Sequence, residues 1–114
     1  MSEAPPGSED LKIIALARAA RARVAAAEGA AVRDETGRTY AAAAIALPSL
    51  RLSALHLAVA MAVSSGASGL EAAVLVSDAA GPGPADLAAV RDLGPKAVVY
   101  HVAADGTVRS TLRP

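Results

Sequence analysis

The chain has 114 residues, no cysteine, and equal numbers of basic and acidic side chains, 11 of each. This length suits one domain with a single core, and an apolar content of 54% excludes an intrinsically disordered chain. Without cysteine, the chain cannot form a disulfide framework, a thiolate nucleophile or a thiolate-rich zinc site. A net charge of zero argues against a general nucleic-acid binder, which usually has a basic face.

The N-terminal residues are acidic and rich in proline, so we expect a loose tail over residues 1–8 and a single domain over 9–114. The tail has neither the basic region nor the apolar region of a signal peptide. The apolar stretch at 50–63 is interrupted by polar side chains and is too short to span a bilayer. We therefore expect a cytoplasmic protein that does not associate with membranes.

Hydrophobic spacing and turn signals divide the domain into helices and strands. Ser8 is a favourable N-cap for the first helix. Gly37 suits the turn of a hairpin, which we prefer to a helix through the alanines at 41–44. In chain order we predict a helix at 9–27, strands at 30–35 and 38–46, a helix at 53–63, a strand at 70–78, a helix at 84–93, and strands at 96–103 and 107–112. This order predicts a layered α/β domain with a mixed sheet.

The helix at 53–63 is apolar around nearly its whole circumference. Ser49 or Ser53 can cap its N-terminus, and Gly66 can end it. If one face packs on the sheet, the opposite face exposes more apolar surface than soluble monomers usually tolerate. We therefore predict a homodimer or homotetramer assembled through this helix, with the following side chains at or near the contact: His56, Ala58 and Met61.

Several stretches of the chain resemble those of a known enzyme family in order and in short matches. "DETGRTYAAAAIALPSL" resembles a hairpin that leads into a metal-binding helix, and "SALHLAVAMAVSSG" resembles that helix in its central alanine and its Ser-x-Gly ending. "LEAAVLVSD" with the helix after it, and "AVVYHVAADGTVRSTL", resemble the remaining strands and their Asp-Gly turn. The family is that of the cytidine deaminases. The resemblance covers residues 9–112 and implies a three-layer fold, with a mixed five-stranded sheet and helices on both faces.

The resemblance also implies where the family's chemistry should lie. A His or Cys with two further Cys holds a zinc ion that activates water, and a glutamate that does not bind the metal moves the proton. Ser53 corresponds to the first ligand and Leu55 to the glutamate. Gly83 and Asp86 correspond to the two cysteines. None of these side chains can supply a thiolate, and Leu55 cannot transfer a proton.

The positions that hold the ribose in the family correspond to Ala44 and Ala46, which offer no side-chain donor or acceptor. The resemblance thus implies a non-catalytic member, a pseudoenzyme, that holds no zinc or other cofactor. We expect it to have a binding or structural role, and the sequence does not identify a small-molecule or protein partner. Relatives typically assemble as tetramers through the metal-binding helices, which agrees with the oligomer predicted above.

Two other interpretations stay open. An atypical nucleoside deaminase would need a metal held by His56, Asp86 and His101 alone, although Asp86 also suits the first turn of a helix without any function. Ser53 and His56 lie one helical turn apart but lack the glycine elbow of a serine hydrolase, so they do not indicate a nucleophile and its base.

The second interpretation is a weak nucleic-acid-associated module that uses five arginines: Arg18, Arg21, Arg23, Arg33 and Arg38. The zero net charge makes this role the less favoured one.

Overall fold

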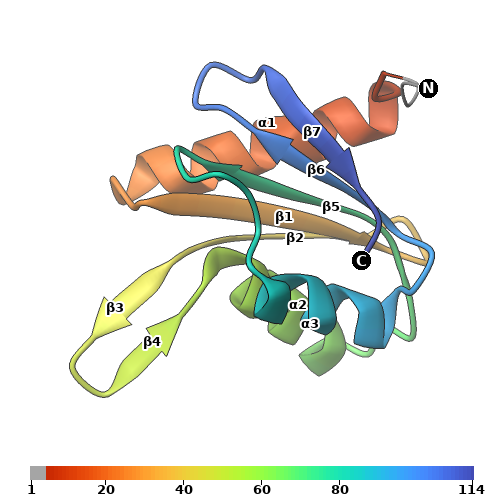
Figure 1. Ribbon diagram of the computed structural model, residues 1–114. Helices are drawn as coiled ribbons and strands as arrows, with labels where there is room; N and C mark the ends of the chain where they lie inside the picture. The colour runs from red at the N-terminus through yellow and green to blue at the C-terminus, as the bar shows by residue number, and fades with distance from the viewer. Residues whose placement is uncertain (1–4) are drawn as a thin grey trace.

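The computed structural model describes residues 5–114, so half of the predicted tail, residues 1–4, lies outside the described residues. Three helices and seven strands follow one another along the described part of the chain and are drawn in Figure 1. The elements are α1 (Ser8–Arg23), β1 (Glu28–Asp34), β2 (Thr39–Ala43), β3 (Ile45–Leu47), β4 (Leu50–Leu52), α2 (Ala54–Ser64), β5 (Leu70–Ser77), α3 (Pro84–Leu93), β6 (Val98–Val102) and β7 (Val108–Leu112).

Five strands form one mixed sheet in the order β2-β1-β5-β6-β7. Strands β5 and β6 are parallel, and the other neighbours are antiparallel. Helix α1 covers one face of the sheet, and α2 and α3 lie on the other (Figure 1). The predicted three-layer α/β fold with a mixed five-stranded sheet is therefore confirmed.

The sheet separates two apolar cores, and β5 contributes to both. Leu75 packs on the side of α2 and α3, whereas Val74 packs on the side of α1. Small residues let the layers approach closely: a Cβ on Gly29 would overlap the carbonyl oxygen of Ala17 in α1. Close packing of alanine and valine thus fills a core that has no Phe or Trp.

The first helix is shorter than predicted. Gly7 occupies the N-cap position and Ser8 is already helical, so the predicted cap at Ser8 is wrong. The helix ends at Arg23 rather than at 27 because Ala25 has a positive φ of 50°. The strand β1 then begins at Glu28, two residues earlier than predicted.

The end of α1 is closed by two backbone hydrogen bonds. The N–H of Ala25 donates to the carbonyl of Ala22 at 3.3 Å, and the N–H of Ala26 donates to that of Arg21 at 3.1 Å. These two bonds and the left-handed Ala25 form a Schellman motif, in which this position is usually glycine. Because alanine stands at this position instead of glycine, the sequence did not predict the end of the helix.

A second hairpin, which the sequence pattern did not predict, follows β2. The predicted strand at 38–46 ends at Ala43, and β3 and β4 follow as a separate two-stranded hairpin. This hairpin projects from the body of the molecule (Figure 1), and its residues Leu47 and Leu50 are exposed. Strands of three residues are too short to show a periodicity of two.

The second helix, α2, divides into a buried and an exposed side. Ala58 is fully buried in the core shared with α3, so its predicted place at a subunit contact is wrong. Met61 is 37% exposed and Val63 53% exposed on the outer side. Among residues 5–114, no helix is both long and apolar enough to cross a membrane.

Candidate functional site

The N-termini of α2 and α3 meet and carry two of the predicted site residues. Ser53 is the N-cap of α2, because its Oγ accepts a hydrogen bond from the backbone N–H of His56 at 3.1 Å. The same hydroxyl donates to Oδ1 of Asp86, in the first turn of α3, at 2.6 Å. The Asp86 side chain is only 11% exposed, and the positive ends of the helix dipoles stabilise its carboxylate. The structure therefore joins Ser53 and Asp86 directly.

The ring of His56 connects the same two helices. Its Nε2 lies 3.0 Å from the carbonyl oxygen of Ala85 and 3.6 Å from Oδ1 of Asp86. The ring thus faces α3, and the hydrogen bond between His56 and Ser53 uses the backbone N–H rather than the ring. A nucleophile–base pair of Ser53 and His56 is not assembled.

The other two positions of the predicted zinc motif offer no polar side chain. Leu55 lies in the first turn of α2, is fully buried, and packs within the core. Gly83 is the exposed N-cap residue of α3 and makes no side-chain cap. At the positions that correspond to the proton carrier and to one metal ligand, the chain therefore has an aliphatic side chain and a glycine.

The two positions predicted to correspond to ribose-binding residues differ in how far they are buried. Ala44 is half-buried between β2 and β3, and its N–H donates to the carbonyl of Glu28 at 3.1 Å. Ala46 is exposed on the projecting β3 strand. The Glu28 side chain accepts a hydrogen bond from the N–H of Ala54, the first residue of α2, at 3.3 Å. Sequence reasoning missed Glu28, because a glutamate at the start of a strand carries no distinctive signal.

A second polar pair is buried elsewhere on the same face of the sheet. Nε2 of His101 lies 3.0 Å from Oγ of Ser77, and both residues are about 1% exposed. His101 is thus engaged with β5 and does not join His56 and Asp86. Within residues 5–114, no group of three or more His, Cys, Asp or Glu side chains is placed to hold a metal ion.

The model of the family described as cytidine deaminase-like matches residues 6–106. The chain belongs to the cytidine deaminase-like family. Among solved structures, this family member is similar to the cytidine deaminase of Burkholderia pseudomallei, with a TM-score of 0.75, 23% identity and 90% of each chain covered. It is also similar to the cytidine deaminase of Mycobacterium leprae, with a TM-score of 0.64, 22% identity, and 88% of this chain and 90% of that chain covered. At these identities, the likeness to the solved structures shows the fold. None of the curated protein sequences matches the chain.

The side chains at the α2–α3 junction do not fit the zinc ion of cytidine deaminase chemistry. Zinc in proteins is held by thiolate sulfur, imidazole nitrogen and carboxylate oxygen. Here Oγ of Ser53 and Oδ1 of Asp86 are hydrogen-bonded to each other, and Nε2 of His56 contacts a backbone carbonyl. Among the described residues, every buried side-chain nitrogen and oxygen has a hydrogen-bonding partner. The donor set is therefore already satisfied within the protein.

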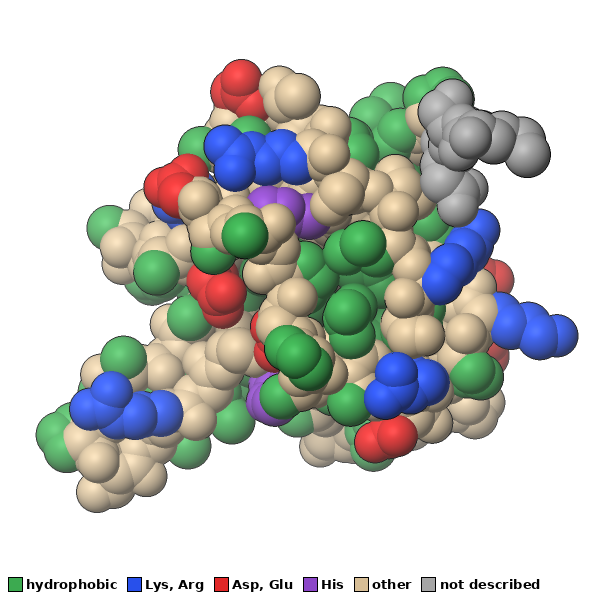
Figure 2. Space-filling model, in the orientation of Figure 1, with side chains coloured by type: hydrophobic (Ala, Val, Ile, Leu, Met, Phe, Trp, Pro, Cys, Tyr) green, Lys and Arg blue, Asp and Glu red, His purple; other side chains and the backbone are tan. Residues whose placement is uncertain are grey.

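Two of the arginines considered for nucleic-acid binding, Arg21 and Arg33, are paired with carboxylates. Arg33 is largely buried and is paired with Asp10 at 2.8 Å and with Glu71 at 2.9 Å. Burial lowers the pKa of Arg33, but the hydrogen bonds with Glu71 and Asp10 outweigh it, and the net shift is upward. Arg21 is paired with Asp78. Figure 2 shows the Lys and Arg side chains of one face separated from one another by other residues.

Proposed function

We propose that this chain is a non-catalytic member of the cytidine deaminase-like family with a binding or structural role. The observation that carries the proposal is the hydrogen bond of 2.6 Å between Ser53 and Asp86. It joins α2 and α3 at two positions that correspond to zinc ligands in the resemblance. A hydroxyl bonded to a carboxylate at this length is a strong, charge-assisted hydrogen bond, which supports a structural role for both side chains.

The buried Leu55 supports the same proposal. General acid–base catalysis contributes about 10²–10⁴-fold to the rate of an enzyme, and metal activation of water contributes separately. Leu55 cannot exchange a proton, and it is fully buried in the core that α2 shares with the sheet. A cytidine deaminase reaction would therefore need both a metal site and a proton carrier that differ from those of the family.

Zinc analysis and a deaminase assay test this proposal. After incubation with zinc and dialysis, we expect the purified protein to retain no stoichiometric metal and to leave cytidine and deoxycytidine unchanged. The variant Leu55→Glu should remain inactive, because it restores the acid but no metal ligand. One tightly held zinc per chain, or turnover in the ordinary enzyme range of about 1–10³ per second, would instead support the atypical deaminase.

We further propose that the partner of the chain is a second copy of itself, bound through the outer side of α2. A groove of about 380 Å³ runs along this side, between α2 and β2. Leu57, Ala60 and Met61 line it together with Tyr40 of β2. Its apolar lining is surface that a symmetric contact would remove from water.

The oligomeric state and a matched pair of lysine variants test this contact. We expect light scattering at micromolar concentration to give a multiple of the 11.3 kDa chain mass, and Met61→Lys to dissociate the assembly. Leu16→Lys is the control, because Leu16 on α1 is 39% exposed and Met61 is 37% exposed, yet only Met61 lines the groove. A monomeric wild-type protein, or equal effects of both variants, would refute the interface.

A further inference from the structure

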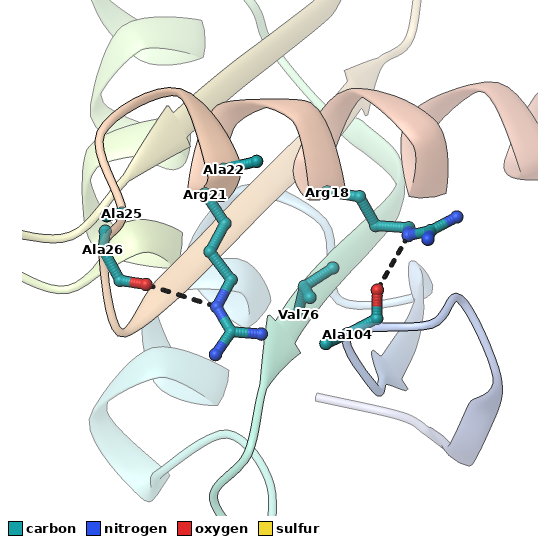
Figure 3. Close-up of a pocket in the computed structure, with 7 residues that line it drawn as sticks. All are labelled: Arg18, Arg21, Ala22, Ala25, Ala26, Val76 and Ala104. Atoms are coloured by element: carbon teal, nitrogen blue, oxygen red, sulfur yellow. Dashed lines mark hydrogen bonds between the residues drawn. The ribbon is translucent and has the colours of Figure 1, made fainter.

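A pocket of about 350 Å³ lies at the C-terminal end of α1, on the face of the sheet opposite to Ser53 and Asp86. It is lined by alanines, by Val76 of β5, and by the side chains of Arg18 and Arg21 (Figure 3). The walls are thus mainly apolar, with a guanidinium group on each side of Val76. This combination suits a ligand with an apolar body and an anionic group.

Of the two arginines, Arg21 is better placed to bind an anionic group in the pocket. Its Nε donates to the carbonyl of Ala26 at 3.2 Å, which fixes the orientation of the planar guanidinium group. Its Nη2 donates to Oδ2 of Asp78 at 2.9 Å. The Arg21 side chain is 18% exposed, whereas the Asp78 side chain is 75% exposed. The guanidinium group of Arg21 is therefore already oriented to bind a carboxylate. The carboxylate that it now binds, that of Asp78, lies at the surface and is held by one ion pair.

Arg18 already makes a hydrogen bond on the other side of the pocket, at Ala104. Its Nε donates to the carbonyl of Ala104 at 3.0 Å, and its outer nitrogens point away from Arg21 in Figure 3. The carboxylate of Asp105 is close enough that Arg18 helps to lower its pKa, after the larger effect of hydrogen bonds with Thr107. The charge of Arg18 is thus partly compensated, and an anion in the pocket would bind Arg21.

The surroundings favour a monoanion over a dianion. Asp78 is bonded to Arg21, Asp105 is close enough to Arg18 to feel its charge, and the C-terminal end of a helix is the negative pole of its dipole. An ion pair with a side chain as exposed as Asp78 contributes little free energy, so its loss costs an incoming carboxylate little. We propose that this pocket binds a small monocarboxylate, whose carboxylate replaces Asp78 on Arg21 and whose apolar body packs over Val76. The proposal does not depend on whether the chain is catalytic.

Titration with benzoate, benzamide and phenyl phosphate, followed by NMR and calorimetry, tests the proposal. Benzoate is expected to bind saturably and to shift the signals of the Arg21 Nε–H and the Val76 amide. Benzamide, which has the same shape without the charge, should not bind, and phenyl phosphate should bind more weakly than benzoate. Benzamide binding as well as benzoate, or phenyl phosphate binding more tightly, would overturn the monocarboxylate assignment.

Three variants test the role of each charge. Arg21→Gln should weaken benzoate binding about tenfold or more, since it removes a charged hydrogen-bond donor. Asp78→Asn should strengthen binding about two- to fivefold, because it removes the competing carboxylate. Arg23→Gln is the control, because Arg23 is an exposed arginine in the last turn of α1 that does not line the pocket. Unchanged affinity in Arg21→Gln, weaker binding in Asp78→Asn, or no saturable shift at millimolar benzoate would refute the site.

Discussion

Replacing Ser53 with alanine tests whether the junction of α2 and α3 is a structural cross-link. The Ser53 hydroxyl accepts a hydrogen bond from the N–H of His56 and donates one to Asp86, so the substitution removes both bonds at once. If the pair serves the fold, the protein should lose stability. If the two side chains instead serve to bind a ligand, the substitution should lower the free energy of unfolding only a little.

The expected loss follows from the two bonds. Substitution of an N-cap serine by alanine costs about 1 kcal/mol, and loss of a hydrogen bond to a charged group costs about 1.5–3 kcal/mol. The Asp86 side chain is 11% exposed, so water replaces the lost donor only in part. We therefore expect Ser53→Ala to lower the free energy of unfolding by about 2–4 kcal/mol, a large part of the roughly 5–15 kcal/mol typical of a domain.

Urea unfolding followed by circular dichroism measures this loss. The midpoint should fall while the slope of the free energy against urea stays unchanged. Ser49→Ala is the matched control, because Ser49 is exposed in the turn between β3 and β4, and its loss should change stability by less than about 0.5 kcal/mol.

A double-mutant cycle isolates the pair itself. With Asp86→Ala as the second substitution, the coupling between the two positions should lie in the range of about 0.5–3 kcal/mol that is typical of contacting residues. Additive effects of the two substitutions, or a Ser53→Ala protein as stable as the Ser49→Ala control, would refute the structural role of the bond.

Two further predictions concern the opposite face of the sheet. Ala25→Gly should raise the free energy of unfolding by about 0.5–1 kcal/mol, because it relieves the left-handed conformation at φ 50° but adds chain entropy to the unfolded state; urea unfolding checks it. Burial, and after it the hydrogen bond to Asp10, raises the pKa of Tyr100 from its ordinary value of 10.0 to about 12. The stability that protonated Tyr100 contributes is therefore present below pH 10 and is lost as the pH rises to about 12. The stability difference between wild type and Tyr100→Phe, measured from pH 9 to 12, should therefore shrink by up to about 3 kcal/mol, and a constant difference would contradict the assignment.

The sequence predicted the elements whose ends carry their own signals. Pro84 and Gly94 mark the two ends of α3, and the predicted bounds of 84–93 agree with the structure. The long apolar run of β5 was also placed correctly, because burial on both faces removes the alternation typical of half-exposed strands. The end of α1 was missed because alanine stands where a helix usually ends in glycine, at Ala25.

The candidate site was predictable in part. The resemblance placed Ser53, Leu55 and Asp86 at corresponding positions of one site, and the structure brings Ser53 and Asp86 together. Their direct bond was not predictable, since it depends on how two helices far apart in the sequence are oriented. The contact of Glu28 with α2 likewise depends on the register of β1, which the sequence pattern does not specify.

The N-termini of α2 and α3 are joined directly by protein groups. In a structural or catalytic zinc site, the ion links the elements that supply its ligands, and its binding contributes free energy to folding. In this chain the hydrogen bond from Ser53 to Asp86 and the contact of the His56 ring with Ala85 join the same helix ends. Both contacts use only groups that the chain itself provides. At this point the chain therefore has a connection between the two helices that requires no ion, which supports the non-catalytic role that we propose.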